Sequence, residues 1–263
     1  GEERNLVDGL VVRRRVVPDK TGGVPVPVVL YLPLVKARVL ERRQERAVDE
    51  GVERASRREQ RGGEQSSRDG FFDALGVDAA EQAGIKTQVG FMNRFGAAVE
   101  QLKALLDSGE AGLVGLMAAR YFCNALHAHW WRTREKSGGQ IVEQAIHMFD
   151  VMRYLLGDPV SVYSRQENLF HREVEGYTAE DVSATIVSFA SGAIGVVYAT
   201  NGAIPGQWIS DYRLVAQNLT AEVANANTAT IVFTTDPERE PLQIASEKDF
   251  RRDQILDLLN AIR

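Results

Sequence analysis

The stretch of chain from Ser137 to Gly157 joins a loop of small residues to a largely apolar helix with ionisable side chains on one side. At roughly 100° per residue, its polar side chains fall on one narrow stripe and its apolar side chains cover the rest. Gly157 and Pro159 then end the helix, as a C-cap residue and a helix breaker do. The stripe consists of Glu143, His147, Asp150 and Tyr154.

This stripe is either a solvated helix face or the wall of a site. Most polar helix faces are simply solvated, but this one has no lysine and places Glu143 four residues before His147. Side chains at that spacing are neighbours, close enough to hydrogen-bond. A carboxylate that orients an imidazole keeps it available for general acid/base chemistry. Spacing alone leaves both interpretations open and makes Glu143 and His147 the catalytic candidates.

The same stretch resembles the second domain of the Gfo/Idh/MocA oxidoreductases, whose pattern is Gly-Gly-Gly-x-x-x-Asp-x-x-x-His-x-x-Asp. Here Ser137 stands for the first glycine and Glu143 for the first aspartate, while His147 and Asp150 match the histidine and the last acid. The resemblance covers about residues 83–263. Its other parts are residues 83–88, which resemble a last strand of the nucleotide domain, the Gly-Phe-Met-Asn-Arg-Phe segment at 90–95, Trp130-Trp131, and a hairpin at 177–201.

The resemblance implies an NAD(P)-dependent dehydrogenase acting on a sugar, polyol or related alcohol, with NAD or NADP as cofactor. His147 would take or return the hydroxyl proton, and Glu143 would orient and tune it. An arginine beside Phe95 can equally be a structural salt-bridge partner, and the tryptophans can equally pack in a core. The residues implied as substrate contacts are Asn93, Arg94, Trp130, Trp131 and Asp150.

Hydrophobic periodicity and turn residues predict the elements of this part. Short connections such as Ala190-Ser191-Gly192 predict antiparallel neighbours. The expected fold is therefore α+β, one large and mostly antiparallel open sheet with helices on one face, as in a dihydrodipicolinate-reductase-like C-terminal domain. Helices are expected at 97–106, 140–156 and 249–263, and strands at 113–124, 160–166, 182–189, 194–200, 211–216, 220–224 and 228–234.

The sequence departs from the family before residue 83. The chain contains no Gly-x-Gly-x-x-Gly fingerprint and no Glu-Lys-Pro segment, and 82 residues leave little room for βαβ units of about 30 residues each. The N-terminal Rossmann domain is thus expected to be absent or degenerate, and the cofactor-binding residues are unknown. We expect residues 1–82 to be disordered or a frame-shifted remnant of a nucleotide-binding domain, and residues 83–263 to be a substrate and oligomerisation domain truncated at its C-terminus.

Two segments before residue 83 are unusual. Residues 24–35 are apolar but contain three prolines, which allows at most an edge strand. Residues 36–68 are rich in Arg, Glu and Gln, which favours a solvated helix or disorder. We therefore expect the chain before Phe71 to be poorly packed.

Composition narrows the range of partners and compartments. The net charge is −5 and the pI is near 5.5, so we expect no nucleic-acid partner. Cys123 is the single cysteine, which excludes an internal disulfide and favours a reducing, cytoplasmic location. No membrane span or signal peptide is predicted. The resemblance further implies a small-molecule substrate and a homo-oligomer formed through the open sheet face, with Ile186, Ile194, Val196 and Tyr198 as candidate contacts.

Two other functions compete with the dehydrogenase. In the first, His127 and His129 alternate at the end of a strand and complete a metal site with Glu143 and His147. In the second, the chain is a non-catalytic remnant that only oligomerises and binds no NAD(P). Even for the dehydrogenase, the missing phosphate loop predicts weak NAD(P) binding or none.

Overall fold

The computed structural model describes residues 4–7, 10–13, 82–126 and 128–263, and the chain divides into two compact units, Gly1–Arg68 and Asp69–Arg263. In the first unit, β1 (Arg4–Val7) and β2 (Leu10–Arg13) form an antiparallel hairpin. The expectations for residues 24–35 and 36–68, and for the packing of the chain before Phe71, concern segments outside the described residues.

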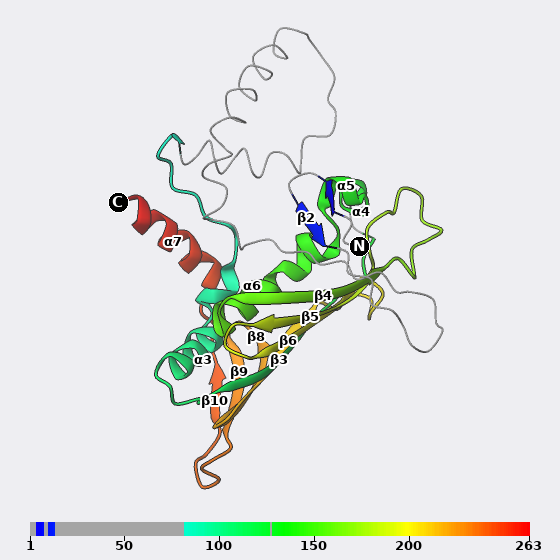
Figure 1. Cartoon of the computed structure of the whole chain (residues 1–263). Coiled ribbons are helices and arrows are strands. Elements are labelled where there is room, and N and C mark those ends of the chain that lie inside the picture. Colours follow the sequence, from blue (N-terminus) through cyan, green and yellow to red (C-terminus); the bar gives the residue numbers. More distant parts are fainter. Residues whose placement is uncertain (1–3, 8–9, 14–81, 127) are drawn as a thin grey trace, which may run out of the picture. The chain divides into compact units, whose positions relative to one another are not determined.

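The second unit contains one eight-stranded sheet in the order β10-β9-β8-β7-β3-β6-β5-β4 (Figure 1). All neighbouring strands are antiparallel except β3 and β6, which are parallel. The strands are β3 (Val114–Phe122), β4 (Pro159–Glu167), β5 (Val182–Phe189), β6 (Ile194–Thr200), β7 (Ile209–Ala216), β8 (Leu219–Asn225), β9 (Thr228–Phe233) and β10 (Leu242–Ala245).

Most of the helical residues come before β4 in the chain. The helices are η1 (Met92–Phe95), α3 (Ala97–Asp107), α4 (His129–Arg132), α5 (Arg134–Ser137), the π-helical turn η2 (Ile141–Ala145), α6 (Ile146–Leu156) and α7 (Phe250–Ile262). Among the described residues, no helix is both long and apolar enough to span a bilayer.

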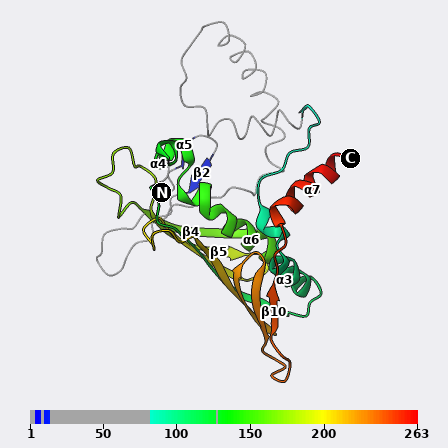
Figure 2. The same ribbon diagram turned by 180° about the vertical axis from the view of Figure 1, so that it is seen from behind.

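The helices α3 and α6 cover one face of the sheet, and both views show them on the same side (Figures 1 and 2). Between them and the sheet lies the main core, which includes Leu102, Met148 and Met152, all nearly or fully buried. At Gly195 on β6, an added Cβ would lie 2.2 Å from the sulfur of Met152. A side chain at this position would displace the buried side chain of Met152, so the glycine lets α6, the helix that bears the polar stripe, pack close to β6.

The other face of the sheet is open. Ile186, Ile194 and Tyr198 each keep 39–47% of their surface exposed, and Val196, which pairs with Ile186 across the strands, is half-buried. Because successive residues of a strand point to opposite faces, these side chains point away from α3 and α6. They therefore do not pack beneath the chain's own helices.

The predicted α+β fold is confirmed, with differences at particular elements. The strands β5 and β6 have the predicted bounds, and β5–β6 and β8–β9 are antiparallel as expected. The short β10, α4 and α5 were not predicted. Residues 85–91 form no regular secondary structure, so the expectation of a last nucleotide-domain strand at 83–88 is wrong.

Candidate active site

A glycine loop precedes the helix of the polar stripe, and it brings a buried carboxylate to the helix start. Gly138 and Gly139 have φ of +77° and +93°, values that favour glycine. A Cβ on Gly139 would lie 2.2 Å from an oxygen of Glu180. The Glu180 carboxylate accepts a hydrogen bond from the backbone N–H of Ile141 at 2.9 Å and pairs with Arg134 at 3.3 Å. Small residues are thus needed so that an anion can cap the first turn.

The first turn is π-helical, a geometry that often marks functional sites. Glu143 lies within it, so its spacing from His147 is not that of two residues on a regular α-helix. No hydrogen bond joins the two side chains. Instead, the indole N–H of Trp131 donates to Glu143 Oε2 at 2.6 Å. The expected hydrogen bond between Glu143 and His147 is therefore not formed, because the first turn is π-helical and the Glu143 carboxylate accepts from Trp131.

His147 is half-buried on α6, and its Nδ1 is buried with no hydrogen-bond partner in the described part of the chain. The edge of Phe91 lies against the imidazole, with ring centroids 6.4 Å apart. Burial lowers the pKa of His147, and the charges of Asp150 and Glu143 oppose this effect. A neutral imidazole near pH 7 can accept a proton, which is the property that a general base needs.

Two further candidates, Arg94 and Asp150, meet each other. Arg94 Nε donates to Asp150 Oδ2 at 2.9 Å and Arg94 Nη2 donates to Asp150 Oδ1, while Asp150 is only 7% exposed. The guanidinium also lies over the rings of Tyr154 and Phe91, at 5.1 and 5.6 Å from their centroids. This ion pair, whose hydrogen bonds raise the pKa of Arg94, joins η1 to α6. Arg94 therefore forms a structural salt bridge, which was the alternative to a substrate contact, and its partner is Asp150.

A cavity of about 330 Å³ lies beside this ion pair. Its volume is at the low end of the range for small-ligand sites. His147 is not among its lining residues, and Asn93 lies half-buried on η1 nearby in sequence. The cavity is lined by Arg94, Arg153, Tyr154, Gly157 and Asp158.

The two tryptophans have different environments. Trp131 is 2% exposed and packs at a steep angle against Tyr177, with ring centroids 6.4 Å apart, so its ring lies in a core. Trp130 is 50% exposed at the start of α4. Of the pair, only Trp130 presents an accessible ring face for stacking on a sugar.

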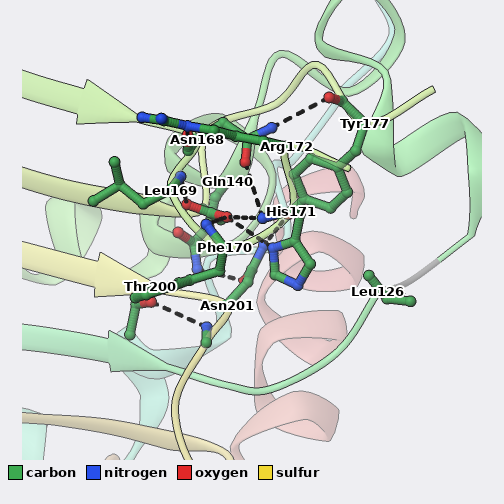
Figure 3. A network of polar contacts seen from close by, with 12 residues as sticks. Leu126, Gln140, Asn168, Leu169, Phe170, His171, Arg172, Tyr177, Thr200 and Asn201 are labelled. Carbon is green, nitrogen blue, oxygen red and sulfur yellow. Dashed lines mark hydrogen bonds and ion pairs between the residues drawn. The ribbon is translucent and has the colours of Figure 1, made fainter. Parts of the chain in front are cut away.

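A buried polar network begins at Gln140, directly after the glycine loop (Figure 3). The sequence did not predict these residues as a unit. Gln140 donates to Asn201 Oδ1 at 2.6 Å, and Asn201 donates to the hydroxyl of Tyr177 at 2.9 Å. Burial raises the pKa of Tyr177 to about 12. The ring of His171 stacks on Tyr177, with centroids 4.6 Å apart, and its Nδ1 lies 2.8 Å from Asp181.

Asp181 anchors this network to the backbone. Its carboxylate, which is fully buried, accepts hydrogen bonds from three successive backbone N–H groups, those of Leu169, Phe170 and His171, at 2.7–2.9 Å. Two adjacent acids, Glu180 and Asp181, directly before an apolar strand were the available signal, because buried carboxylates require such partners.

The described residues do not show the geometry that the alternative metal site requires. His129 begins α4 and does not extend a strand, since β3 ends at Phe122. Within the part of the chain that the structure describes, no group of three or more His, Cys, Asp or Glu side chains is arranged to hold an ion. His127 lies outside the described residues.

Comparison with known sequences adds independent information. Residues 99–232 match the GFO/IDH/MocA C-terminal domain. The chain is 32% identical over 124 residues to the scyllo-inositol 2-dehydrogenase (NAD(+)) of Bacillus subtilis, which covers 47% of this chain and 36% of that protein. It is 37% identical over 103 residues to the inositol 2-dehydrogenase of Salmonella typhimurium, which covers 37% of this chain and 29% of that protein. The chain thus spans only about a third of the length of these relatives.

Solved structures share the fold. Levoglucosan dehydrogenase in complex with NADH and levoglucosan matches with a TM-score of 0.63 at 19% identity, over 70% of this chain and 59% of that one. An oxidoreductase domain protein from Kribbella flavida matches with a TM-score of 0.60 at 22% identity, over 70% and 58%. Since the domain match spans just over half of the 263 residues, this chain belongs to the GFO/IDH/MocA family through its C-terminal domain.

Proposed function

We propose that this chain supplies the substrate and acid/base half of an NAD(P)-dependent oxidoreductase that acts on a sugar or polyol. The observation that supports this most directly is His147, half-buried, with a lowered pKa and a buried Nδ1 that lacks a partner. Such an imidazole can take a proton from a substrate hydroxyl and return it. Glu143 and Asp150 supply negative charge that stabilises the protonated ring once it forms.

The candidate residues described above are suited to contacts with the substrate, but they do not form a binding site for the dinucleotide. The pyrophosphate of NAD(P) requires a glycine-rich turn between a strand and a helix. In the described residues the only parallel strand pair is β3 and β6, and neither strand is followed by such a turn. We therefore assign these residues proton transfer and substrate binding alone. Within this proposal, Trp130 and Asn93 are the accessible substrate contacts, while Arg94 and Asp150 hold η1 against α6.

The test is polyol-dependent reduction of NAD⁺ or NADP⁺ by the full chain, with the cofactor at millimolar concentration so that weak binding does not hide turnover. Inositols are suitable substrates because relatives are inositol dehydrogenases. His147→Ala should lower kcat by about 10²- to 10⁴-fold. His129→Ala, a residue that only the metal alternative requires, should retain activity. Activity that depends on stoichiometric zinc, or that survives loss of His147, contradicts the proposal.

We also propose that the chain assembles with copies of itself through the open sheet face. Supporting this are exposed apolar side chains on adjacent strands, where a monomer would leave them in water. Ile186→Glu and Ile194→Glu should each shift the sedimentation coefficient toward the monomer, whereas Ile204→Glu, on an exposed loop, should not. A monomeric wild-type chain at micromolar concentration contradicts this. The residues concerned are Leu116, Ile186, Ile194, Tyr198 and Val215, each 38–47% exposed.

We also propose a reducing, cytoplasmic location, because the single cysteine is present as a thiol. Cys123 is a buried thiol outside any disulfide, and burial raises its pKa to about 11, so it is a poor nucleophile and a poor partner for disulfide exchange.

A further inference from the structure

We propose that Trp131 is a positioning residue whose indole N–H holds the Glu143 carboxylate in place and thereby sets how strongly its charge acts on His147, the residue that accepts the substrate proton. This inference deepens the proposed function and rests on it for the roles of Glu143 and His147. The observation that supports this inference is the hydrogen bond of 2.6 Å from Trp131 Nε1 to Glu143 Oε2.

The indole is fixed independently of Glu143. Trp131 is buried in a small core of its own with Tyr177 and Ala179. Behind it, the backbone N–H groups of Thr178 and Ala179 both donate to the carbonyl of Arg132, at 2.9 and 3.0 Å. The loop before β5 is thereby bound to α4, and the direction of the indole N–H is set by packing.

A carboxylate is the acceptor that such a donor binds most strongly, because charge-assisted hydrogen bonds are about twice as strong as neutral ones. Without the indole, Glu143 would be free to rotate toward His147, which follows four residues later in the chain. A carboxylate paired with the imidazole would stabilise the protonated ring, so that fewer rings would be neutral and able to accept a substrate proton at a given pH. The orientation of the Glu143 side chain thus sets how much of His147 is available as a base.

The charged groups around His147 come from three elements. Glu143 of η2 and Asp150 of α6 both raise its pKa. Arg94 of η1 pairs with Asp150, which reduces the effect of that charge, and Phe91 supplies only an aromatic edge. Glu143 is therefore the charge whose position can still change.

The test is the pKa of His147, measured by NMR titration of the imidazole in the full chain without cofactor or substrate. Trp131→Phe should raise this pKa by about half a pH unit or more, because the released carboxylate approaches the ring. Glu143→Gln should lower it, since Glu143 raises it in the wild type. In the Glu143→Gln background, Trp131→Phe should have no further effect. Trp208→Phe is the control, because this exposed indole donates to the hydroxyl of Tyr121.

The double variant separates positioning from packing. If Trp131→Phe shifts the pKa of His147 equally in both backgrounds, the ring acts only as core and the proposal is overturned. The same follows if it shifts the pKa in neither. Should Trp131→Phe fail to fold, the indole ¹H–¹⁵N signal of Trp131 in the wild type gives a second measurement. It should move as Glu143 ionises and stay fixed in Glu143→Gln, and a wild-type signal that does not titrate also overturns the proposal. None of these measurements requires catalysis, so their failure is distinct from failure of the dehydrogenase assay.

Discussion

At the scale of single residues, His147 couples the candidate site to stability. Its folded-state pKa lies below the ordinary value of 6.5 because burial disfavours the charged ring. Above pH 6.5 the ring is neutral in both the folded and the unfolded state. As the pH falls from 6.5 through the folded-state pKa, the unfolded state takes up a proton first. We therefore expect the free energy of unfolding to decrease over that interval.

Urea unfolding at a series of pH values measures this dependence. His147→Gln, which cannot titrate, should flatten the part of the pH profile just below 6.5. An identical slope in the variant would show that other groups set the dependence.

Gly139 is the residue where backbone and site are most tightly linked. Gly139→Ala places a methyl group against the Glu180 carboxylate at a φ of +93°. We expect a loss of at least about 2 kcal/mol in unfolding free energy, from backbone strain and from displacing a buried carboxylate. Gly176→Ala is the matched control. It also has a positive φ, +71°, but a Cβ there would meet nothing within 4 Å, so only strain of about 1 kcal/mol remains. Equal losses in the two variants would show that Glu180 can move aside.

At the scale of elements, the polar stripe was predictable and its internal contacts were not. Period alone places Glu143, His147 and Asp150 on one side of a helix. It cannot show that the first turn is π-helical, that Arg94 pairs with Asp150, or that Trp131 binds Glu143, because these depend on segments that are distant in the chain or on a change of helix type. The strands β5 and β6 were predicted to the residue because both are rich in β-branched residues and are joined by the short Ala190-Ser191-Gly192 connection, whereas β10 has only four residues.

The ion pair between η1 and α6 can be tested as an element-level contact. Asp150→Asn should lower the unfolding free energy by about 1–3 kcal/mol, because Arg94 would lose its charged partner while remaining partly buried. Arg94→Met should cost a similar amount, and the double variant should cost much less than the sum. Additive losses from urea unfolding would show that the two residues do not stabilise the fold as a pair.

At the scale of the whole molecule, the sequence predicted one sheet with helices on one face, and the family resemblance implied an open face on the other side. It could not say which face the apolar residues Ile186 and Ile194 occupy, because a strand pattern is the same from either side. The α3 and α6 helices decide this by covering the other face. Residues 1–82 gave no pattern from which a nucleotide-binding fold could be predicted.

Hydride transfer needs the nicotinamide held against the substrate carbon. The dinucleotide is usually held by a phosphate loop with the pattern Gly-x-Gly-x-x-Gly, and this pattern occurs nowhere in the 263 residues. We therefore expect the full chain to bind NADH with a dissociation constant in the millimolar range or weaker, measured by equilibrium dialysis or fluorescence titration. His147→Ala should change this little. Micromolar binding that survives His147→Ala would show that the chain has a cofactor site whose sequence differs from Gly-x-Gly-x-x-Gly.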